Sequence, residues 1–264
     1  MNPIFLKIGN ISIYWYSIFI LIGILTACMI VLREANKKNI PKKFIEDLFF
    51  YTIIFGLIGA RLYYVIFEYK QYINNPLDIF KVWEGGLAIH GGIIAGLITI
   101  IIMTKKHKIS ILEMTDMIVV GVIIAQAIGR WGNFFNGEAY GPVTTLDNLK
   151  QLHIPQFIIN GMNINGVYYH PTFLYESLWN ILGFIFLIIL KHTNKLKTGQ
   201  LTGTYFIWYS VGRFFIESLR QDSLMLFGIL KQAQIISIIL IIIGIIIIFV
   251  SRKNKKYCED LDKM

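Results

Sequence analysis

Apolar residues follow one another along this chain in long runs that short polar connections separate. A helix needs about 20 mainly apolar residues to cross the hydrocarbon core of a bilayer. Seven runs approach that length, and the fourth and sixth are the weakest because arginine interrupts each of them. The pattern predicts spans at about residues 13–32, 47–67, 86–103, 115–135, 172–190, 201–219 and 229–250. We therefore expect an all-α integral membrane protein with seven transmembrane helices.

One longer polar stretch, at about residues 137–170, interrupts this pattern and is rich in Asn, Gly and Pro. Such a composition is typical of turns and short elements rather than of a span. We expect it to form a small head outside the membrane. No repeat or linker divides the chain, so the sequence predicts a single polytopic membrane domain over residues 1–264.

Composition supports this class of protein. The chain is 55% hydrophobic and 16% charged, whereas soluble domains have about a quarter charged residues. The formal net charge of +9 would suggest nucleic acid in a soluble protein, but in a membrane protein Lys and Arg collect in cytoplasmic loops. With two cysteines, Cys28 and Cys258, no framework of disulfides is possible.

The distribution of Lys and Arg also predicts the orientation. Alternate connections and the C-terminal tail carry 16 of these residues on one side, and the other side carries 6. The richer side should be cytoplasmic. The N-terminus and the 137–170 head are then expected outside, and the C-terminus in the cytoplasm.

Ionisable and polar residues of the predicted spans fall at one depth. A rise of 1.5 Å per residue puts Arg61 and Arg130 about 20 Å from the inner ends of their spans, and Arg213 about 18 Å. His90 lies about 6 Å below the outer face. The same outer half also contains Tyr14, Tyr16, His170, Glu176 and Glu217.

Convergence from several helices indicates one polar cavity in the outer leaflet, because scattered ion pairs need no common depth. Arginine binds phosphate in a bidentate manner and stays charged when desolvated. An anion at this depth is most simply a phospholipid phosphate. Structural alternatives stay open: Arg130 pairs with Glu138, Arg213 pairs with Glu217 one turn on, and Arg61 snorkels to the outer surface.

Residues 129–141 read GRWGNFFNGEAYG and match G-R-x-G-N-F-x-N-x-E-x-x-G. This stretch resembles the signature of bacterial prolipoprotein diacylglyceryl transferases. Further pieces resemble the family in the same order, over about residues 10 to 250. They are Trp15-Tyr16, Trp83–Gly86 with His90–Gly92, His170–Glu176, and Tyr209 with Arg213, Glu217 and Arg220.

The resemblance implies an enzyme of the bacterial cell membrane that acts at the outer leaflet. Its reaction would move the diacylglyceryl group of phosphatidylglycerol to the lipobox cysteine of a preprolipoprotein signal peptide. The products would be a thioether and glycerol 1-phosphate, and neither a metal nor an organic cofactor is implied. Phosphatidylglycerol, the signal peptide and the membrane are the expected partners, and nucleic acid is not.

The chemistry assigns roles to the matching residues. The leaving phosphate gains charge that Arg130 and Arg213 would stabilise. His90 is a suitable general base for the thiol near neutral pH, or it binds the headgroup instead. The resemblance implies a substrate site that is completed by Tyr16, Asn133, Asn136, Glu138, Gly141, Tyr209, Glu217 and Arg220.

Three other classes of membrane protein compete with this interpretation. A phospholipid or anion transporter with an arginine-lined cavity is the main alternative, although it would need access from both faces. A rhomboid-like protease needs a G-x-S nucleophile, which the sequence lacks. A retinal-binding receptor needs a lysine in the middle of the seventh span, whereas Lys231 is expected at the outer end.

Overall fold

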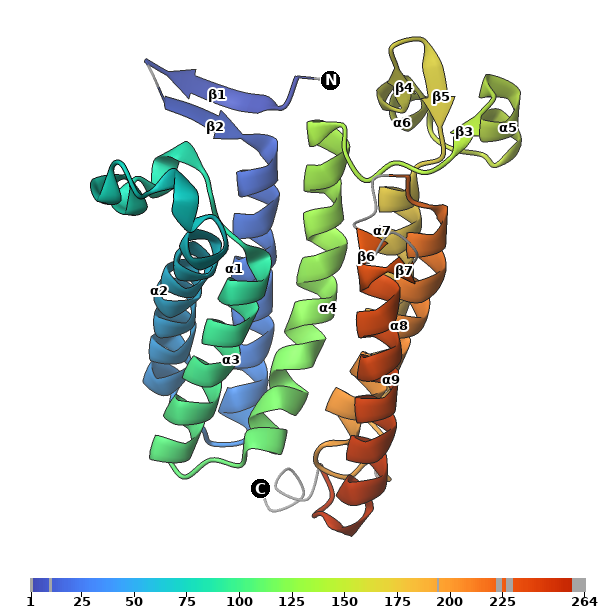
Figure 1. The fold of residues 1–264 in the computed structure, drawn as a ribbon. Helices are drawn as coiled ribbons and strands as arrows, with labels where there is room; N and C mark the ends of the chain where they lie inside the picture. Colours follow the sequence, from blue (N-terminus) through green and yellow to red (C-terminus); the bar gives the residue numbers. More distant parts are fainter. Residues whose placement is uncertain (1, 10, 194, 222–224, 227–229, 258–264) are drawn as a thin grey trace. The chain divides into compact units, whose positions relative to one another are not determined.

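The computed structural model describes residues 2–9, 11–193, 195–221, 225–226 and 230–257. Within this part of the chain, seven helices have 18 residues or more (Figure 1). Each overlaps one predicted span, and their ends differ from the predicted ends by at most five residues. They are α1 (Trp15–Lys37), α2 (Lys42–Phe67), α3 (Ile89–Lys106), α4 (Ile111–Asn136), α7 (Thr172–Lys191), α8 (Gln200–Leu219) and α9 (Gln232–Val250).

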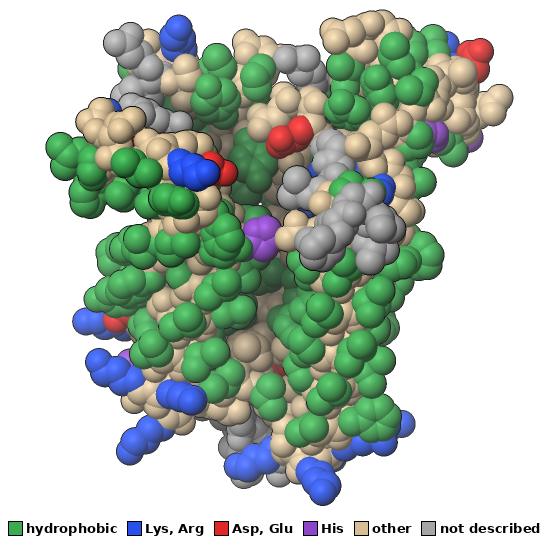
Figure 2. Space-filling view, viewed as in Figure 1, with side chains coloured by type: hydrophobic (Ala, Val, Ile, Leu, Met, Phe, Trp, Pro, Cys, Tyr) green, Lys and Arg blue, Asp and Glu red, His purple; other side chains and the backbone are tan. Residues whose placement is uncertain are grey.

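Six helices of the described chain are long and apolar enough to cross a membrane: α1, α2, α3, α4, α7 and α9, the last with the short helix η4 (Ser251–Lys253). The remaining long helix, α8, contains Gln200, Arg213 and Glu217, which lower its apolarity. Figure 2 shows hydrophobic side chains over the surface of α9, where Ile238, Ile242 and others are exposed. Apolar faces of this extent suit lipid contact, and the chain is a multi-pass membrane protein.

Short strands lie in the connections, where the all-α prediction expected none. A hairpin of β1 (Ile4–Ile8) and β2 (Ile11–Tyr14) precedes α1, and Gly9 in its turn has φ +58°. A second antiparallel pair, β6 (Met225–Leu226) and β7 (Leu230–Lys231), lies between α8 and α9. The prediction was wrong for these segments because strands of two to five residues leave almost no periodic signal.

The expected head between α4 and α7 is a folded subdomain. Its strands are ordered β3-β5-β4, and all pairs are antiparallel. Asn165 and Gly166 both have positive φ in the β4–β5 turn, as a type I′ hairpin requires. Its elements are β3 (Val143–Thr144), α5 (Leu146–Gln151), α6 (Gln156–Gly161), β4 (Asn163–Ile164) and β5 (Val167–Tyr169).

The chain divides into two compact units. The first comprises residues 1–31 and 115–264, and the second comprises residues 32–114. In the first unit, the N-terminal part of α1 packs antiparallel on α4 through small residues. A Cβ on Gly23 would lie 3.1 Å from the Ala125 carbonyl oxygen, and one on Gly121 would lie 3.0 Å from that of Ala27. Small residues let membrane helices approach closely.

Helices α7 and α8 are interlocked by two tryptophans. The Trp179 indole donates to the Trp208 carbonyl at 2.9 Å, and the Trp208 indole donates to the Trp179 carbonyl at 3.1 Å. The two rings stack with centroids 4.7 Å apart. Each ring lies over a glycine of the other helix, Gly183 or Gly212, where a Cβ would clash. This contact fixes the register of α7 against α8, and with it the alignment of their polar residues.

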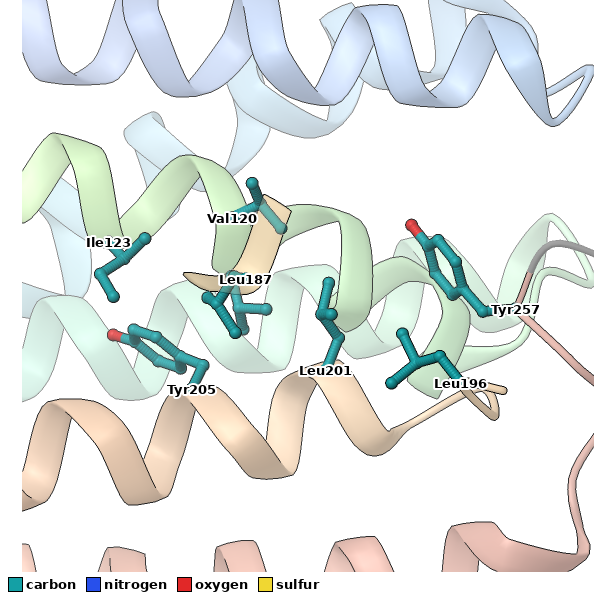
Figure 3. Close-up of a cluster of buried hydrophobic side chains, with 8 residues drawn as sticks. Val120, Ile123, Leu187, Leu196, Leu201, Tyr205 and Tyr257 are labelled. Carbon is teal, nitrogen blue, oxygen red and sulfur yellow. The ribbon is translucent and has the colours of Figure 1, made fainter. Parts of the chain in front are cut away.

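A buried hydrophobic cluster lies between α4, α7 and α8 (Figure 3). Val120 and Ile123 of α4 contribute to it together with Tyr205 of α8, and Tyr257 of the C-terminal tail closes its end. The Tyr257 amide donates to the Leu196 carbonyl at 2.8 Å. Lipid tails are as apolar as these side chains, so the cluster stabilises the bundle through packing.

A buried carboxylate caps the first turn of α8. Asp116, at the start of α4, accepts hydrogen bonds from the amides of Gly199 (2.5 Å) and Thr202 (2.8 Å), and from the Thr202 hydroxyl (2.6 Å). A negative charge is favourable at a helix N-terminus, where amide groups lack partners within the helix. Asp116 therefore joins α4 to α8 at the end of α4 opposite Arg130.

In the second unit, α2 and α3 pack antiparallel through glycines. A Cβ on Gly59 would lie 2.7 Å from the Gly91 carbonyl oxygen, and one on Gly92 would lie 3.4 Å from that of Gly56. The sequence predicts that Gly91 and Gly92 allow close approach of a helix or a ligand. The structure confirms the approach of a helix.

Candidate functional site

A chain of ion pairs links α4, α7 and α8 in the first unit. Arg130 of α4 contacts Oε1 of Glu176 at 2.5 Å, and Arg213 of α8 contacts Oε2 of the same carboxylate at 3.0 Å. Glu176 belongs to α7 and is only 3% exposed. One buried carboxylate therefore holds two guanidinium groups from different helices.

The series of ion pairs continues toward the C-terminal end of α8. Arg213 also contacts Glu217, one helical turn on, at 2.7 Å, and Arg220 lies 4.0 Å from the same carboxylate. The Lys231 ammonium donates to the carbonyls of Glu217 (2.7 Å), Arg220 (2.8 Å) and Ser218 (3.1 Å). A cation there stabilises the last carbonyls of the helix. We call Arg130, Glu176, Arg213, Glu217 and Arg220 the arginine cluster.

A second polar group lies at the C-terminal end of α4. Arg130 donates to the Asn133 side-chain oxygen at 3.4 Å. The amides of Asn133 and Asn136 both donate to Oε1 of Glu138, at 2.9 Å and 3.3 Å. Glu138 is exposed, and its carboxylate is linked to Arg130 of the cluster only through Asn133.

Two tyrosines lie near Arg130, and one of its own N–H groups has no partner in the described part of the chain. Tyr16 of α1 and Tyr209 of α8 lie close enough to interact with its charge. Tyr16 packs on Gly132, where a Cβ would come within 2.7 Å of the ring. The Nε atom of Arg130 is buried and has no hydrogen-bond partner among the described residues. That donor is suited to an acceptor oxygen of a ligand.

The head joins α7 next to this site. The Gly141 amide donates to the His170 carbonyl at 2.9 Å, and a Cβ on Gly141 would lie 3.0 Å from that of His170. The His170 ring contacts the Tyr175 hydroxyl at 3.0 Å. Close backbone contact therefore explains a glycine at position 141.

An apolar cavity of about 220 Å³ opens in the same unit. Its walls come from α1, α4 and α7, near the turns that carry Arg130 and Glu176. It is lined by Phe19, Ile124, Ala127, Ile128, Trp131, Ser177 and Ile181. The arginine cluster and this cavity therefore share helices α4 and α7.

The arginine of the second unit has a different environment. Arg61 is 7% exposed, and its Nε, Nη1 and Nη2 atoms all donate to backbone carbonyls between α2 and α3. These contacts agree with a structural role for Arg61, which was one of the open alternatives, but its guanidinium is buried by the connecting segment instead of reaching the outer surface. The acceptors are the carbonyl oxygens of Ile79 (2.8 Å), Gly85 (2.7 Å), Gly86 (3.0 Å), Asp78 (2.6 Å) and Lys81 (3.4 Å).

His90 lies in the first turn of α3, in the second unit, next to the glycines that pack on α2. Its ring stacks with Tyr63 of α2 at a centroid distance of 6.0 Å. The side chain is partly exposed.

The structure brings most of the predicted site residues of the first unit together. The expected pair of Arg213 with Glu217 is present, whereas Arg130 pairs with Glu176 and not with Glu138. The sequence noted Glu176 only as a polar residue at the right depth and missed its central position. A carboxylate within an apolar span was the signal that could have singled it out. Within the described residues, no group of three His, Cys, Asp or Glu could hold a metal ion.

The fold and the arginine cluster define an integral membrane protein with an anion-compatible polar site among its helices. Comparison with known proteins narrows this class. The family model described as Prolipoprotein diacylglyceryl transferase matches residues 3–250, and the chain belongs to that family, as its motifs indicated.

Relatives named phosphatidylglycerol–prolipoprotein diacylglyceryl transferase match almost the whole chain. The protein from Halalkalibacterium halodurans is 46% identical over 97% of this chain and 88% of its own length. The one from Listeria welshimeri is 48% identical over 98% of this chain and 94% of its own. The one from Staphylococcus haemolyticus is 49% identical over 96% of this chain and 89% of its own.

Proposed function

We propose that the protein transfers the diacylglyceryl group of phosphatidylglycerol to the lipobox cysteine of a preprolipoprotein. Family membership over residues 3–250 is the observation that carries this proposal. The arginine cluster supports it, because a phospholipid phosphate is the anion that an arginine site inside a membrane protein would bind. The transporter alternative is not favoured, since the relatives bear the name of a transferase.

In the proposed reaction, the cysteine sulfur attacks the glycerol carbon that carries the phosphate. The S–H proton passes to a base, the S–C bond forms, and the C–O bond breaks with its electron pair leaving on the phosphate oxygen. The thiolate is the reactive form of cysteine, so the base is needed. His90 is the proposed base, and headgroup binding is its alternative role.

The leaving glycerol phosphate gains negative charge, which Arg130 and Arg213 are proposed to stabilise. The buried Nε of Arg130 offers a donor to a phosphate oxygen. The apolar cavity beside α4 suits an acyl chain of the lipid. The proposed substrate contacts are those of Tyr16, Asn133, Asn136, Glu138, Gly141, Tyr209, Glu217 and Arg220.

We further propose that α8 is the seventh span and that the two units form one polytopic domain in the bacterial cell membrane. The Trp179 and Trp208 interlock supports a spanning α8, because it holds the middle of α8 against the apolar helix α7. The Lys and Arg distribution favours an external N-terminus, an external head and a cytoplasmic C-terminus. The site would then face the outer leaflet.

Cysteine labelling in intact cells tests this orientation. Cys28 and Cys258 are first replaced, and single cysteines are then introduced at Asn160 in the head and at Lys106 at the end of α3. A membrane-impermeant maleimide should label the cysteine at position 160 and spare the one at position 106. The reverse pattern would contradict both the orientation and the outer-leaflet site.

The transfer itself is tested with purified protein, labelled phosphatidylglycerol and a lipobox peptide. The expected result is a peptide that carries the label, with glycerol phosphate released in equal amount. A peptide whose lipobox cysteine is replaced by serine is the matched control. Movement of labelled lipid across a vesicle membrane with no labelled peptide would support a transporter instead.

A further inference from the structure

Glu176 differs from the other carboxylates of the arginine cluster in what it joins. It contacts Arg130 and Arg213 through its two oxygens, so it bridges α4 and α8 across α7. Glu217 contacts arginines of its own helix end. The exposed fraction of Glu176 is 3%, and a charge so buried interacts strongly with its neighbours because water screens it little.

The described charged side chains of the arginine cluster, together with Lys231 and Glu138 that are attached to it, comprise four cations and three carboxylates, which leaves one net positive charge. A phosphodiester has one negative charge. A phosphomonoester has about −1.5 to −2 at neutral pH, because its second ionisation lies near pH 6. The net charge of the cluster therefore matches the diester and is smaller than the charge of the monoester.

We propose that Glu176 is a positioning residue that sets the charge selectivity of this site, holding the two arginines for a phosphodiester and limiting the affinity for a phosphomonoester. This inference rests on the proposed function, in which the lipid substrate is the diester and glycerol phosphate is the monoester product. Without the Glu176 charge, the cluster would carry two net positive charges and would retain the product. Glu176 thus favours product release.

The test measures binding of two soluble phosphates to purified protein at pH 8. Glycerophosphoglycerol is the diester probe and glycerol 1-phosphate is the monoester probe. In Glu176→Gln the ratio of monoester to diester affinity should rise at least about fivefold, because an added positive charge attracts the more highly charged anion more strongly. The inhibition constant of glycerol 1-phosphate in the transfer reaction should fall by a similar factor.

Compensating variants keep the proposal falsifiable if Glu176→Gln does not fold. Arg213→Gln lowers the net charge to zero, so the affinity ratio should fall below that of the wild type. The double variant Glu176→Gln/Arg213→Gln restores one net positive charge, and its ratio should return to within about threefold of the wild type. A ratio that does not follow the net charge across these proteins would overturn the proposal.

Asp116→Asn is the matched control. Asp116 is also a buried carboxylate of the first unit, but it caps α8 at the opposite end of α4. Its replacement should lower thermal stability and leave the affinity ratio unchanged. An equal change of the ratio in Asp116→Asn would mean that the effect of Glu176→Gln is structural.

The two proposals fail in different ways. Wild-type protein that binds both phosphates with charge-dependent selectivity but transfers no lipid would refute the proposed function alone. Transfer with an unchanged ratio in Glu176→Gln would refute the role of Glu176 alone. Wild-type protein that transfers lipid but binds neither soluble phosphate also counts against the role of Glu176.

Discussion

Arg61 and Arg130 both lie in long apolar helices, and the sequence puts them at the same depth, yet their partners differ. Arg61 has five carbonyl acceptors, which matches the five N–H groups of a guanidinium. Arg130 has a carboxylate and an amide oxygen as partners, and its buried Nε has no hydrogen-bond partner among the described residues. All the N–H groups of Arg61 are therefore bonded to the backbone, whereas Arg130 keeps a donor that can bind a ligand.

This difference indicates how to recognise a functional arginine in a membrane protein. Backbone carbonyls are fixed acceptors, so an arginine that they saturate organises a loop. A carboxylate is an anion like a phosphate, so a phosphate oxygen can compete with it for the same N–H groups. The comparison predicts that the first unit contributes anion binding. For the second unit, it leaves His90 as the candidate for chemistry.

His90→Gln gives the largest expected effect and tests whether the second unit takes part in chemistry. If His90 accepts the thiol proton, the transfer rate at saturating lipid should fall by about 10²–10⁴-fold. The wild-type rate should also rise with pH along a limb that the variant lacks. The measurement is the transfer rate against lipid concentration and pH for both proteins.

The headgroup alternative for His90 predicts a different pattern. The variant would then mainly raise the apparent KM for the lipid and keep the pH dependence of the wild type. A near-normal saturated rate with an unchanged pH limb would exclude His90 as the base. The second unit would then be limited to binding and scaffolding.

Arg130→Lys is expected to have the next largest effect. Lysine keeps the charge but loses the planar fork, so activity should fall at least about tenfold, or roughly 1.4 kcal/mol of transition-state stabilisation. Arg213→Lys should behave similarly, because both arginines share Glu176. Wild-type rates in both variants would contradict the proposal that Arg130 and Arg213 contact the phosphate.

The sequence predicted the helices well and the partners of their polar residues only in part. Long apolar runs define spans because the bilayer fixes their length. Gly91 and Gly92 predicted the close approach of a helix or a ligand, and the helix contact is present. The pair of Arg213 with Glu217 was predictable, since residues four apart meet on one helix face. Glu176 is 37 residues from Arg213, and only the packing of α7 on α8 brings them together.

The contacts of Arg61 could not be predicted from the sequence, for another reason. Its acceptors are backbone carbonyls of residues 78–86, and every residue type has a carbonyl. No pattern of side chains marks such a site. The short strands were missed because their few residues do not establish a period of two.

Arg61→Lys should separate stability from activity. Lysine offers three donors in place of five, so at least two carbonyls lose their partner, which costs about 1–3 kcal/mol for each buried group. The melting temperature in detergent should fall clearly, and activity per folded molecule should stay within about threefold of the wild type. Arg33→Lys, at an exposed position of the same unit, is the control and should melt as the wild type does.

Glu138→Gln is expected to have the smallest effect and compares an exposed carboxylate with the buried Glu176. Oε1 of Glu138 accepts hydrogen bonds from Asn133 and Asn136, and a glutamine side-chain oxygen can accept the same two bonds. The rate should therefore change less than about threefold, whereas Glu138→Ala, which removes the acceptor, should lose more. Transfer assays on the two variants decide whether the charge or the acceptor matters. A loss in Glu138→Gln as large as that in Glu138→Ala would mean that the charge of Glu138 acts on the substrate or on Arg130, which would add Glu138 to the arginine cluster.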